Sequence, residues 1–283
     1  MKSEMLLQQK LKEFQQTKQA LLATNFYNFE TLKGVLQAAQ LENNPIILQL
    51  TRSSIEYLGL PVAMELAETM LKIYDVEGWI HLDHGDSYEL VASCLDAGFN
   101  SVMIDASEKP FEENIRITKK VVKLAERYGA NVEAELGYVA KLGQATDKTG
   151  FTEPSEAKFF VEETGVNALA VAIGSAHGFY KEEPKLDLDR LSEINAITNA
   201  VLVLHGASGI PHDTLREAIK KGICKINLAT EIKNIFMKTL KNKLAGHDEI
   251  DLRKIFPLAT DAVTRLVQEK LQAIHIEICK QKQ

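Results

Sequence analysis

Short apolar runs rich in β-branched residues alternate with longer segments of helical pattern along nearly the whole chain. Eight runs have the length of strands and lie at 21–25, 46–51, 79–83, 101–105, 131–136, 168–173, 201–205 and 225–228. The segments between them, such as 111–128 and 155–164, have helical length and period. Eight strands that alternate with helices predict parallel βα units closed into an α/β barrel of the (β/α)8 TIM-barrel type.

The second fold considered is a doubly wound open sheet, which normally carries a glycine-rich loop after its first strand. The chain continues there through Ala23-Thr24-Asn25-Phe26, which contains no glycine, so the barrel is favoured. No linker, low-complexity tract or block of like charge interrupts the pattern. We therefore expect one domain over residues 1–283, with an N-terminal helix at about 3–18 and a C-terminal helix at about 257–279.

Polar side chains gather where the predicted strands end. They include Asn25, Gln49, Thr51, Arg52, Asp105, Asn227 and Thr230. In a (β/α)8 barrel the carboxyl ends of all strands meet at one mouth, and active sites are built there. A barrel without a function at its mouth does not need this pattern, so we expect the active site at that end.

Three histidines, each followed by glycine, lie at or just after the ends of the third, sixth and seventh predicted strands: His84, His177 and His205. One such histidine alone is more often a hydrogen-bonded residue at a strand end. Three neutral imidazoles around one open position are typical of a catalytic zinc site. Their shared place at the mouth favours zinc. His81, on the same strand as His84, is expected to pack behind the site instead.

Acidic residues surround the predicted metal site. Asp83 directly precedes His84, where a carboxylate can orient a ligand or move a proton. Asp105, Glu133 and Glu135 lie on neighbouring strands. Several carboxylates buried together are costly without a cation, which supports a metal ion. For Glu133, pairing with a lysine inside the barrel is an equally good interpretation.

Glycine and hydroxyl residues follow the sixth, seventh and eighth strands. Gly178 follows His177, Gly206-Ala207-Ser208-Gly209 follows the seventh strand, and Asn227-Leu228-Ala229-Thr230 ends the eighth. Loops after strands seven and eight commonly bind phosphate in these barrels. Backbone N–H groups, hydroxyls and a helix N-terminus can hold a phosphate without a lysine. We predict a phosphate site against Gly178, Gly206, Ser208 and Thr230.

Composition limits the partners and the compartment. The net charge is −6 and no stripe of lysine and arginine is present, so no nucleic-acid partner is expected. The three cysteines are widely spaced, without a CxxC motif, which favours a reducing cytoplasm over a disulfide framework. No apolar run approaches the roughly 20 residues that a membrane helix needs, so we expect no membrane partner.

Taken in chain order, these segments resemble the class II aldolases, the family of fructose-1,6-bisphosphate and tagatose-1,6-bisphosphate aldolases. The matching stretches are His81-Leu82-Asp83-His84-Gly85, Ser101-Val102-Met103-Ile104-Asp105, Glu133-Ala134-Glu135-Leu136-Gly137, Ile173-Gly174-Ser175-Ala176-His177-Gly178, Leu204-His205-Gly206-Ala207-Ser208-Gly209-Ile210-Pro211 and Lys225-Ile226-Asn227-Leu228-Ala229-Thr230. The likeness runs from about Asn25 to the last helix, and motifs in this order are highly specific for the family.

The resemblance implies a role for each matching position. His84, His177 and His205 would hold the catalytic zinc, and Asp83 would be the acid/base at the C4 oxygen. Asp105 and Glu135 match positions associated with an alternative or second metal, or with a monovalent cation. The residues expected to contact substrate are Asn25, Gln49, Arg52, Gly178, Gly206, Ala207, Ser208, Asn227, Ala229 and Thr230. The family is commonly oligomeric, so we expect a homodimer or homotetramer.

The implied reaction is cleavage of a phosphorylated ketose, with fructose 1,6-bisphosphate as the first choice, to dihydroxyacetone phosphate and an aldehyde. Tagatose 1,6-bisphosphate and other ketose phosphates remain alternatives. So do a zinc barrel that hydrolyses or isomerises a sugar phosphate and a catalytically silent sugar-phosphate binding protein. A Schiff base on Lys225 is also open, although the zinc histidines make it redundant.

The chain departs from the family pattern in two places. After Gly137 the family usually continues to acidic residues that move the C3 proton, and these are missing at the expected offset. Asp147 or Glu153 could substitute for them. The basic residues for a distal phosphate match only loosely at Arg253 and Lys254. We therefore expect Arg52 to contact the anionic group on the aldehyde half, with the Arg253 pair, from a neighbouring subunit, as the rival.

Overall fold

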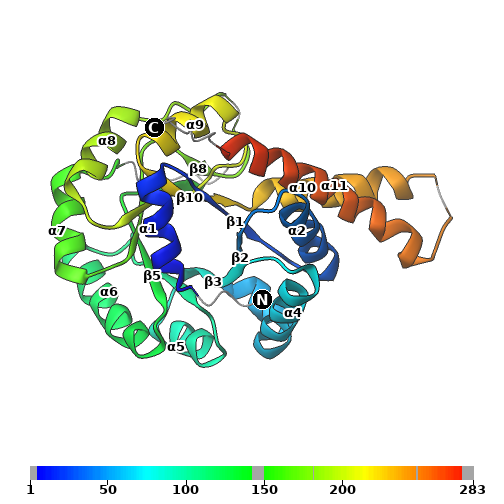
Figure 1. Cartoon of the computed structure of the whole chain (residues 1–283), viewed down its shortest axis with the longest axis horizontal. Helices are drawn as coiled ribbons and strands as arrows, with labels where there is room; N and C mark the ends of the chain where they lie inside the picture. Colours follow the sequence, from blue (N-terminus) through cyan, green and yellow to red (C-terminus); the bar gives the residue numbers. More distant parts are fainter. Residues whose placement is uncertain (1–4, 142–149, 181, 247, 276–283) are drawn as a thin grey trace, which may run out of the picture.

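Eight parallel strands form a closed barrel in the computed structural model, which describes residues 5–141, 150–180, 182–246 and 248–275. The strands are β1 (Leu21–Asn25), β2 (Ile46–Leu50), β3 (Gly78–Gly85), β4 (Ser101–Ile104), β5 (Asn131–Leu136), β7 (Ala168–Val171), β9 (Val201–Leu204) and β10 (Ile223–Leu228). β1 pairs with β10 and closes the ring, which excludes an open sheet. All eight predicted strands and the single-domain barrel are thus confirmed (Figure 1).

The helices surround the strand ring (Figure 1). They are α2 (Phe29–Leu41), α3 (Arg52–Leu58), α4 (Leu60–Tyr74), α5 (Tyr88–Asp96), α6 (Phe111–Ala125), η1 (Glu126–Tyr128), α7 (Pro154–Thr164), α8 (Leu188–Ile197), α9 (His212–Lys220) and α10 (Thr230–Leu244). Several follow N-capping side chains, as where Asn28 accepts from the N–H of Thr31 and Ser87 accepts from that of Leu90. The strands are buried on both sides, which explains their nearly continuous apolar runs.

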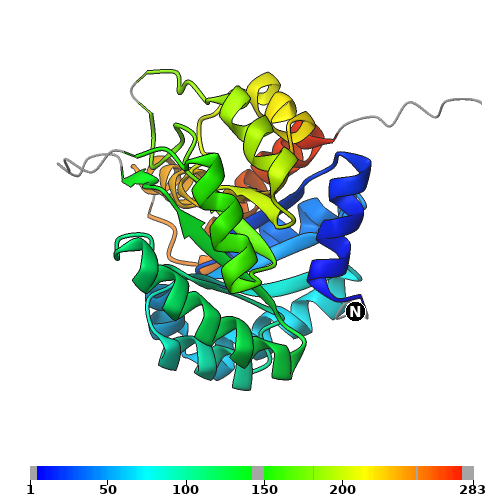
Figure 2. The ribbon, with the colours of Figure 1, turned by 90° about the vertical axis from the view of Figure 1, so that its left-hand side faces the viewer.

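One end of the barrel is closed by α1 (Leu7–Thr17). Leu7 and Leu11 are fully buried against the lowest layer of strand side chains, which includes Trp79 and Val201. Figure 2 shows α1 at one end of the strand ring, so chemistry is confined to the opposite end. This is the predicted N-terminal helix, observed from residue 7 to residue 17.

The C-terminal helix α11 spans Leu252–Ile274 and begins before the expected start at residue 257. The carboxylate of Asp251 accepts from the N–H of Arg253 and caps the helix, and Pro257 lies inside it. A proline this close to a helix start removes one intrahelical hydrogen bond without ending the helix. Residues 276–279 of the expected range lie outside the described residues. In the part of the chain that is described, no helix is long and apolar enough to cross a membrane.

Helices α10 and α11 pack together and project from the barrel as an arm (Figure 1). At the mouth, two-residue strands β6 (Ala140–Lys141) and β8 (Ala176–His177) form a small separate parallel sheet. Sequence periodicity did not predict this sheet, because two residues are too few to show an alternation. It holds the segment that carries His177 over the barrel mouth.

Candidate metal centre and active site

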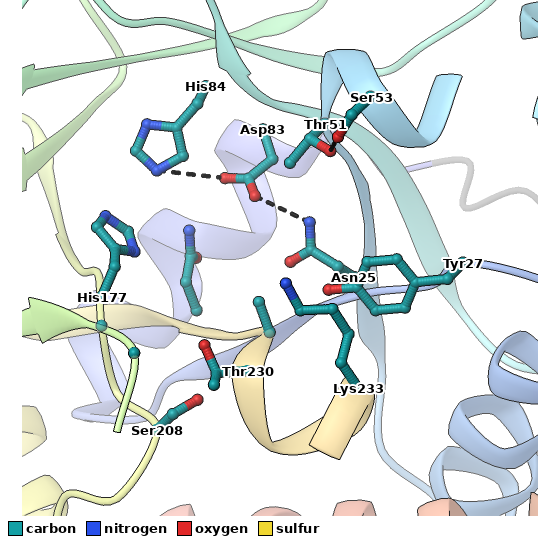
Figure 3. A pocket seen from close by; sticks show the side chains of 14 residues that line it. Asn25, Tyr27, Thr51, Ser53, Asp83, His84, His177, Ser208, Thr230 and Lys233 are labelled. Atoms are coloured by element: carbon teal, nitrogen blue, oxygen red, sulfur yellow. Dashed lines mark hydrogen bonds and ion pairs between the residues drawn. The ribbon is translucent and has the colours of Figure 1, made fainter. Parts of the chain in front are cut away.

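A cavity of about 280 Å³ opens at the mouth of the barrel (Figure 3). Its lining comprises Asn25, Tyr27, Thr51, Ser53, Asp83, His84, His177, Gly178, Gly206, Ser208, Asn227, Ala229, Thr230 and Lys233. These residues come from opposite sides of the strand ring and are brought together only by its closure. Ten of the residues expected to act at the site from sequence are among them.

The three predicted zinc histidines meet at this cavity. Their ring centroids are 4.8 to 5.7 Å apart, and one ring nitrogen from each lies within 4.8 Å of the others. Nε2 of His84 and Nδ1 of His205 are 3.1 Å apart. Two tetrahedral zinc ligands at about 2.1 Å from the ion lie roughly 3.4 Å apart. His84, His177 and His205 therefore have the spacing of one metal site.

Hydrogen bonds decide which nitrogens face the site. Nδ1 of His84 is 2.7 Å from a carboxylate oxygen of Asp105, and Nε2 of His205 is 2.8 Å from one of Glu133. Both acids titrate well below their ordinary pKa, because hydrogen bonds and nearby positive charge outweigh the effect of burial. Carboxylates only accept, so these ring nitrogens carry the protons. The other ring nitrogens, Nε2 of His84 and Nδ1 of His205, face one another at 3.1 Å, an arrangement that a bound metal ion or a proton on His84 can stabilise.

The electrostatics of the site also favour a cation. Burial disfavours a charged His84, but Asp83, the hydrogen bond to Asp105 and the charge of Glu135 outweigh it and raise its pKa to about 9. Burial and the charge of Asp105 raise the pKa of Glu135 to about 8. Oε2 of Glu135 is buried without a hydrogen-bond partner among the described residues. His84, Asp105 and Glu135 form a second group with metal-ligand spacing.

His84 ends β3 in an unusual backbone conformation, with φ of 50° in the left-handed region. Successive strand residues normally point to opposite faces. The left-handed residue breaks this alternation, and the pairing of β3 with β4 shifts register between Leu82 and Gly85. Asp83 and His84 therefore both line the same cavity although they are neighbours in sequence.

Asp83 is buried with one carboxylate oxygen held and the other unpartnered. Oδ2 accepts from Nδ2 of Asn25 at 2.9 Å, whereas Oδ1 has no hydrogen-bond partner in the described part of the chain and lies 3.9 Å from Nε2 of His84 (Figure 3). Burial opposes ionisation, but the charge of His84 and the bond from Asn25 outweigh it and lower the pKa of Asp83. Asp83 is thus an ionised carboxylate whose open oxygen can accept a proton from a substrate hydroxyl.

The expected phosphate residues lie together on the side of the cavity opposite Asp83. Ser208 and Thr230 face it in Figure 3, and Gly178 and Gly206 supply backbone with φ of 113° and 68°. A Cβ on Gly206 would lie 2.4 Å from the carbonyl oxygen of Ala176, so glycine is required there. Asn227 and Ala229 also line the cavity, whereas Ala207 is buried behind it.

Two expected substrate contacts are placed elsewhere. Arg52 begins α3 and lies outside the cavity lining, with its Nε donating to Asp86 at 2.7 Å and its NH2 contacting Asp86 and Ser87. Gln49 is fully buried among the strands, and neither polar atom of its side chain has a hydrogen-bond partner among the described residues. The ion pair joins two residues that are 34 positions apart in sequence, a contact that no local pattern reveals.

Sequence reasoning overlooked Lys233, Tyr27 and Ser53. Lys233 lies one turn after Thr230 on α10, and its Nζ is 5.5 Å from the centroid of the Tyr27 ring (Figure 3). Residues three apart share a helix face, so the position of Thr230 could have revealed Lys233. The cavity therefore carries a lysine on the wall next to Asn25.

Several further residues from the sequence are accounted for. Lys225 is buried and donates to Oε2 of Glu133 at 2.8 Å, as the lysine-pairing interpretation of Glu133 predicted. Glu153 is exposed and paired with Arg190 at 2.8 Å. Arg253 is 90% exposed and paired with Asp251 at 3.0 Å. Asp147 lies outside the described residues.

Comparison with known proteins identifies the family that the chain resembles. A sequence model of the family "Fructose-bisphosphate aldolase class-II" matches residues 5–277. The fructose-bisphosphate aldolase of Helicobacter pylori strain 26695 is 38% identical over 282 residues, covering 89% of this chain and 92% of that protein.

Solved structures share the fold over almost the whole chain. The YdjI aldolase from Escherichia coli K12 aligns with a TM-score of 0.85 and 32% identity, covering 95% of this chain and 96% of that one. A putative fructose-1,6-bisphosphate aldolase from Coccidioides immitis aligns with a TM-score of 0.86 and 28% identity, covering 93% and 94% of the two chains.

Proposed function

The chain belongs to the class-II fructose-bisphosphate aldolase family and is an aldolase, and we propose that it uses zinc held by His84, His177 and His205. Its proposed substrate is fructose 1,6-bisphosphate, cleaved to dihydroxyacetone phosphate and glyceraldehyde 3-phosphate. The observation that carries the zinc assignment is the convergence of the three ring nitrogens within 4.8 Å beside the open oxygen of Asp83. The donor set fits zinc, since it consists of three imidazoles with room for a further ligand.

When bound, zinc polarises the ketose carbonyl and stabilises the negative charge that develops as the C3–C4 bond breaks. The chain supplies the rest of the chemistry. Asp83 accepts the proton of the C4 hydroxyl during cleavage and returns it during condensation, while Asn25 keeps its second oxygen fixed. Ser208, Thr230 and the backbone at Gly206 hold the phosphate of the dihydroxyacetone half.

The second ligand group offers an additional cation position. His84, Asp105 and Glu135 converge beside the first site and share His84 with it. Carboxylate oxygens coordinate hard cations as well as zinc. We assign this group to an alternative zinc position, a second metal ion or a monovalent cation.

For the distal anionic group of the substrate, the cavity supports Lys233 over Arg52. Lys233 faces the cavity from α10, whereas the guanidinium of Arg52 is held by Asp86 outside the lining. An ammonium group on the wall next to Asn25 is suited to a second phosphate. Fructose and tagatose bisphosphates both carry that phosphate, so tagatose 1,6-bisphosphate remains the second candidate substrate.

We propose that the protein is a homodimer in a reducing cytoplasm. The arm formed by α10 and α11 exposes apolar side chains, with Ile250 93% and Leu252 62% accessible. Apolar exposure on a projecting arm supports contact with a second copy, directly or within a homotetramer. Cys94 and Cys224 are both free and buried, which accords with a reducing compartment.

The decisive experiment is an aldolase assay with fructose 1,6-bisphosphate, in which triose phosphate is trapped by a coupled dehydrogenase. We expect turnover, about one zinc per chain, loss of activity with a chelator and recovery on zinc addition. Tagatose 1,6-bisphosphate measured in parallel identifies the preferred ketose. Substrate consumption without triose phosphate would indicate hydrolysis or isomerisation instead, and binding without turnover would indicate a silent binding protein.

A further inference from the structure

A buried ion pair crosses the interior of the barrel directly behind the metal site. Glu133 comes from β5 and Lys225 from β10, two strands separated in the ring by β7 and β9. Both side chains are fully buried, and Nζ of Lys225 donates to Oε2 of Glu133 at 2.8 Å. Neither residue lines the substrate cavity, so the proposed reaction does not use them directly.

Stability alone does not explain such a pair. Removing two charges from water costs as much as or more than their attraction returns, and well-packed apolar residues often do as well or better. The barrel interior around α1 is apolar, and the buried cluster there includes Ala23, Ile47 and Val203. Apolar side chains of this kind could also have filled the positions of Glu133 and Lys225. The role of the charged pair therefore depends on what Glu133 and Lys225 contact besides each other.

The two oxygens of Glu133 have different partners. Oε2 is held by Lys225, while Oε1 is 2.8 Å from Nε2 of His205. His205 is itself completely buried, and its other nitrogen faces the ring of His84 at 3.1 Å. Asn227 also approaches the same nitrogen at 3.1 Å, but only the carboxylate requires a proton there.

Lys225 is held in turn by a second contact. Its Nζ lies 3.4 Å from Nε2 of His81, whose Nδ1 is 2.7 Å from Oγ of Ser101. His81 is fully buried and neutral, so it can accept from the lysine. A series of contacts thus runs from His81 through Lys225 and Glu133 to His205. It fixes the Glu133 carboxylate, because the lysine that holds this carboxylate is itself held by His81.

We propose that Glu133, anchored by Lys225, is the positioning residue that keeps the proton of His205 on Nε2 and so directs Nδ1 to the metal. This inference rests on the proposed zinc function. A ligating histidine commonly donates its other N–H to a carboxylate that fixes the ring, as Asp105 does here for His84. What is specific to this barrel is that the carboxylate behind His205 is itself oriented by a buried cation.

The variant Glu133→Gln gives a sharp test, because an amide has one oxygen that accepts and one nitrogen that donates. The ammonium of Lys225 only donates, so it claims the amide oxygen and turns the NH2 group toward His205. Nε2 must then accept, and the ring proton moves to Nδ1, the atom that should bind zinc. We expect the zinc dissociation constant, measured by chelator competition on the folded protein, to rise about 10- to 100-fold.

Adding Lys225→Met to Glu133→Gln should restore binding. Without the ammonium, the amide oxygen is free to accept from Nε2–H of His205, so the dissociation constant should return to within a few-fold of the wild type. Lys225→Met alone should lower thermal stability, because it leaves a buried carboxylate unpaired. A purely structural role predicts instead that the double variant binds zinc no better than the weaker single variant.

The matched control is Asn131→Ala, on the same strand and two residues before Glu133. The Asn131 amide donates to Ser101 at 3.1 Å and does not contact His205, so zinc binding should change less than twofold. Glu133→Gln with unchanged zinc binding, or a double variant without recovery, would overturn the proposal.

Histidine ¹⁵N NMR of the metal-free wild-type protein supplies a readout that needs no variant to fold. We expect the His205 ring to be protonated at Nε2, and protonation at Nδ1 would overturn the inference. A wild-type protein that binds no zinc, with His205 still protonated at Nε2, would refute the zinc function and show that Glu133 fixes the His205 tautomer without serving a metal. The two failures are therefore distinguishable.

Discussion

Replacing Gly206 by alanine should damage the active site through the backbone alone. Gly206 has φ of 68°, and an added Cβ would lie 2.4 Å from the carbonyl oxygen and 2.6 Å from the carbonyl carbon of Ala176. The left-handed conformation costs a non-glycine residue about 1 to 2 kcal/mol. Forcing a methyl group into packed atoms costs about 1 to 3 kcal/mol more. The loop can avoid this cost only by moving away from Ala176, which precedes the proposed metal ligand His177, or by displacing it.

Restoring the productive loop position in the transition state would therefore cost about 2 to 5 kcal/mol. At about 1.36 kcal/mol for each factor of ten, kcat/KM for fructose 1,6-bisphosphate should fall by roughly 30- to 5,000-fold. Kinetics should be measured together with zinc content and melting temperature, because displacement of His177 would also release zinc.

Gly209→Ala is the matched control in the same loop. Gly209 has φ of 86°, but its Cβ would meet nothing closer than Cδ2 of Tyr180 at 3.5 Å, an ordinary contact. It should carry the conformational cost alone, about 1 to 2 kcal/mol, and lose roughly tenfold in kcat/KM. If Gly206→Ala and Gly209→Ala fall within about threefold of one another, the clash with Ala176 does not govern the loop.

Three further predictions concern single side chains. Asp83→Asn should lower kcat by about 10²-fold or more with zinc content unchanged, and loss of zinc would show that Asp83 is needed for the metal instead. Lys233→Met should raise KM for fructose 1,6-bisphosphate about tenfold, with little effect on fructose 1-phosphate cleavage, whereas the exposed control Lys238→Met should match the wild type for both substrates. Burial and the charge of Lys225 lower the pKa of His81 to about 3. As the pH drops, His81 is therefore protonated in the unfolded chain before it is protonated in the folded protein, and stability falls below about pH 6.5. In denaturant titrations of the metal-free protein, His81→Asn should remove about 2 kcal/mol of the decline between pH 7 and pH 5, and an unchanged decline would contradict a neutral His81.

The sequence predicted the barrel well because its strands are buried on both faces and separated by helices with capping residues. Once eight strands close, the ends of all of them share one mouth, so three histidines far apart in sequence had to approach each other. That single topological step placed His84, His177, His205 and Asp83 together. The same step placed Ser208 and Thr230 on the facing wall.

What the sequence did not reveal depends on contacts that local patterns do not encode. Arg52 follows a strand end, as a substrate ligand would, but Asp86 from another loop holds its guanidinium. Lys233 follows the strand by a full helical turn and reaches the cavity because of the direction in which α10 leaves the barrel. The early start of α11 was hidden by Pro257, which normally marks a helix beginning rather than an interior position.

The left-handed backbone at His84 has an evolutionary consequence. The proposed acid/base Asp83 and the neighbouring proposed metal ligand His84 line one cavity because a single residue departs from strand geometry, so the two groups are gained or lost together. Folding alone would favour glycine or asparagine at this position, since the left-handed conformation costs histidine about 1 to 2 kcal/mol. Histidine must therefore be retained at position 84 by selection for catalysis, because stability alone would favour its replacement. In descendants that no longer need the reaction, position 84 should be among the first residues of the site to be substituted. Such a substitution should also abolish the role of Asp83, even where the aspartate itself is retained.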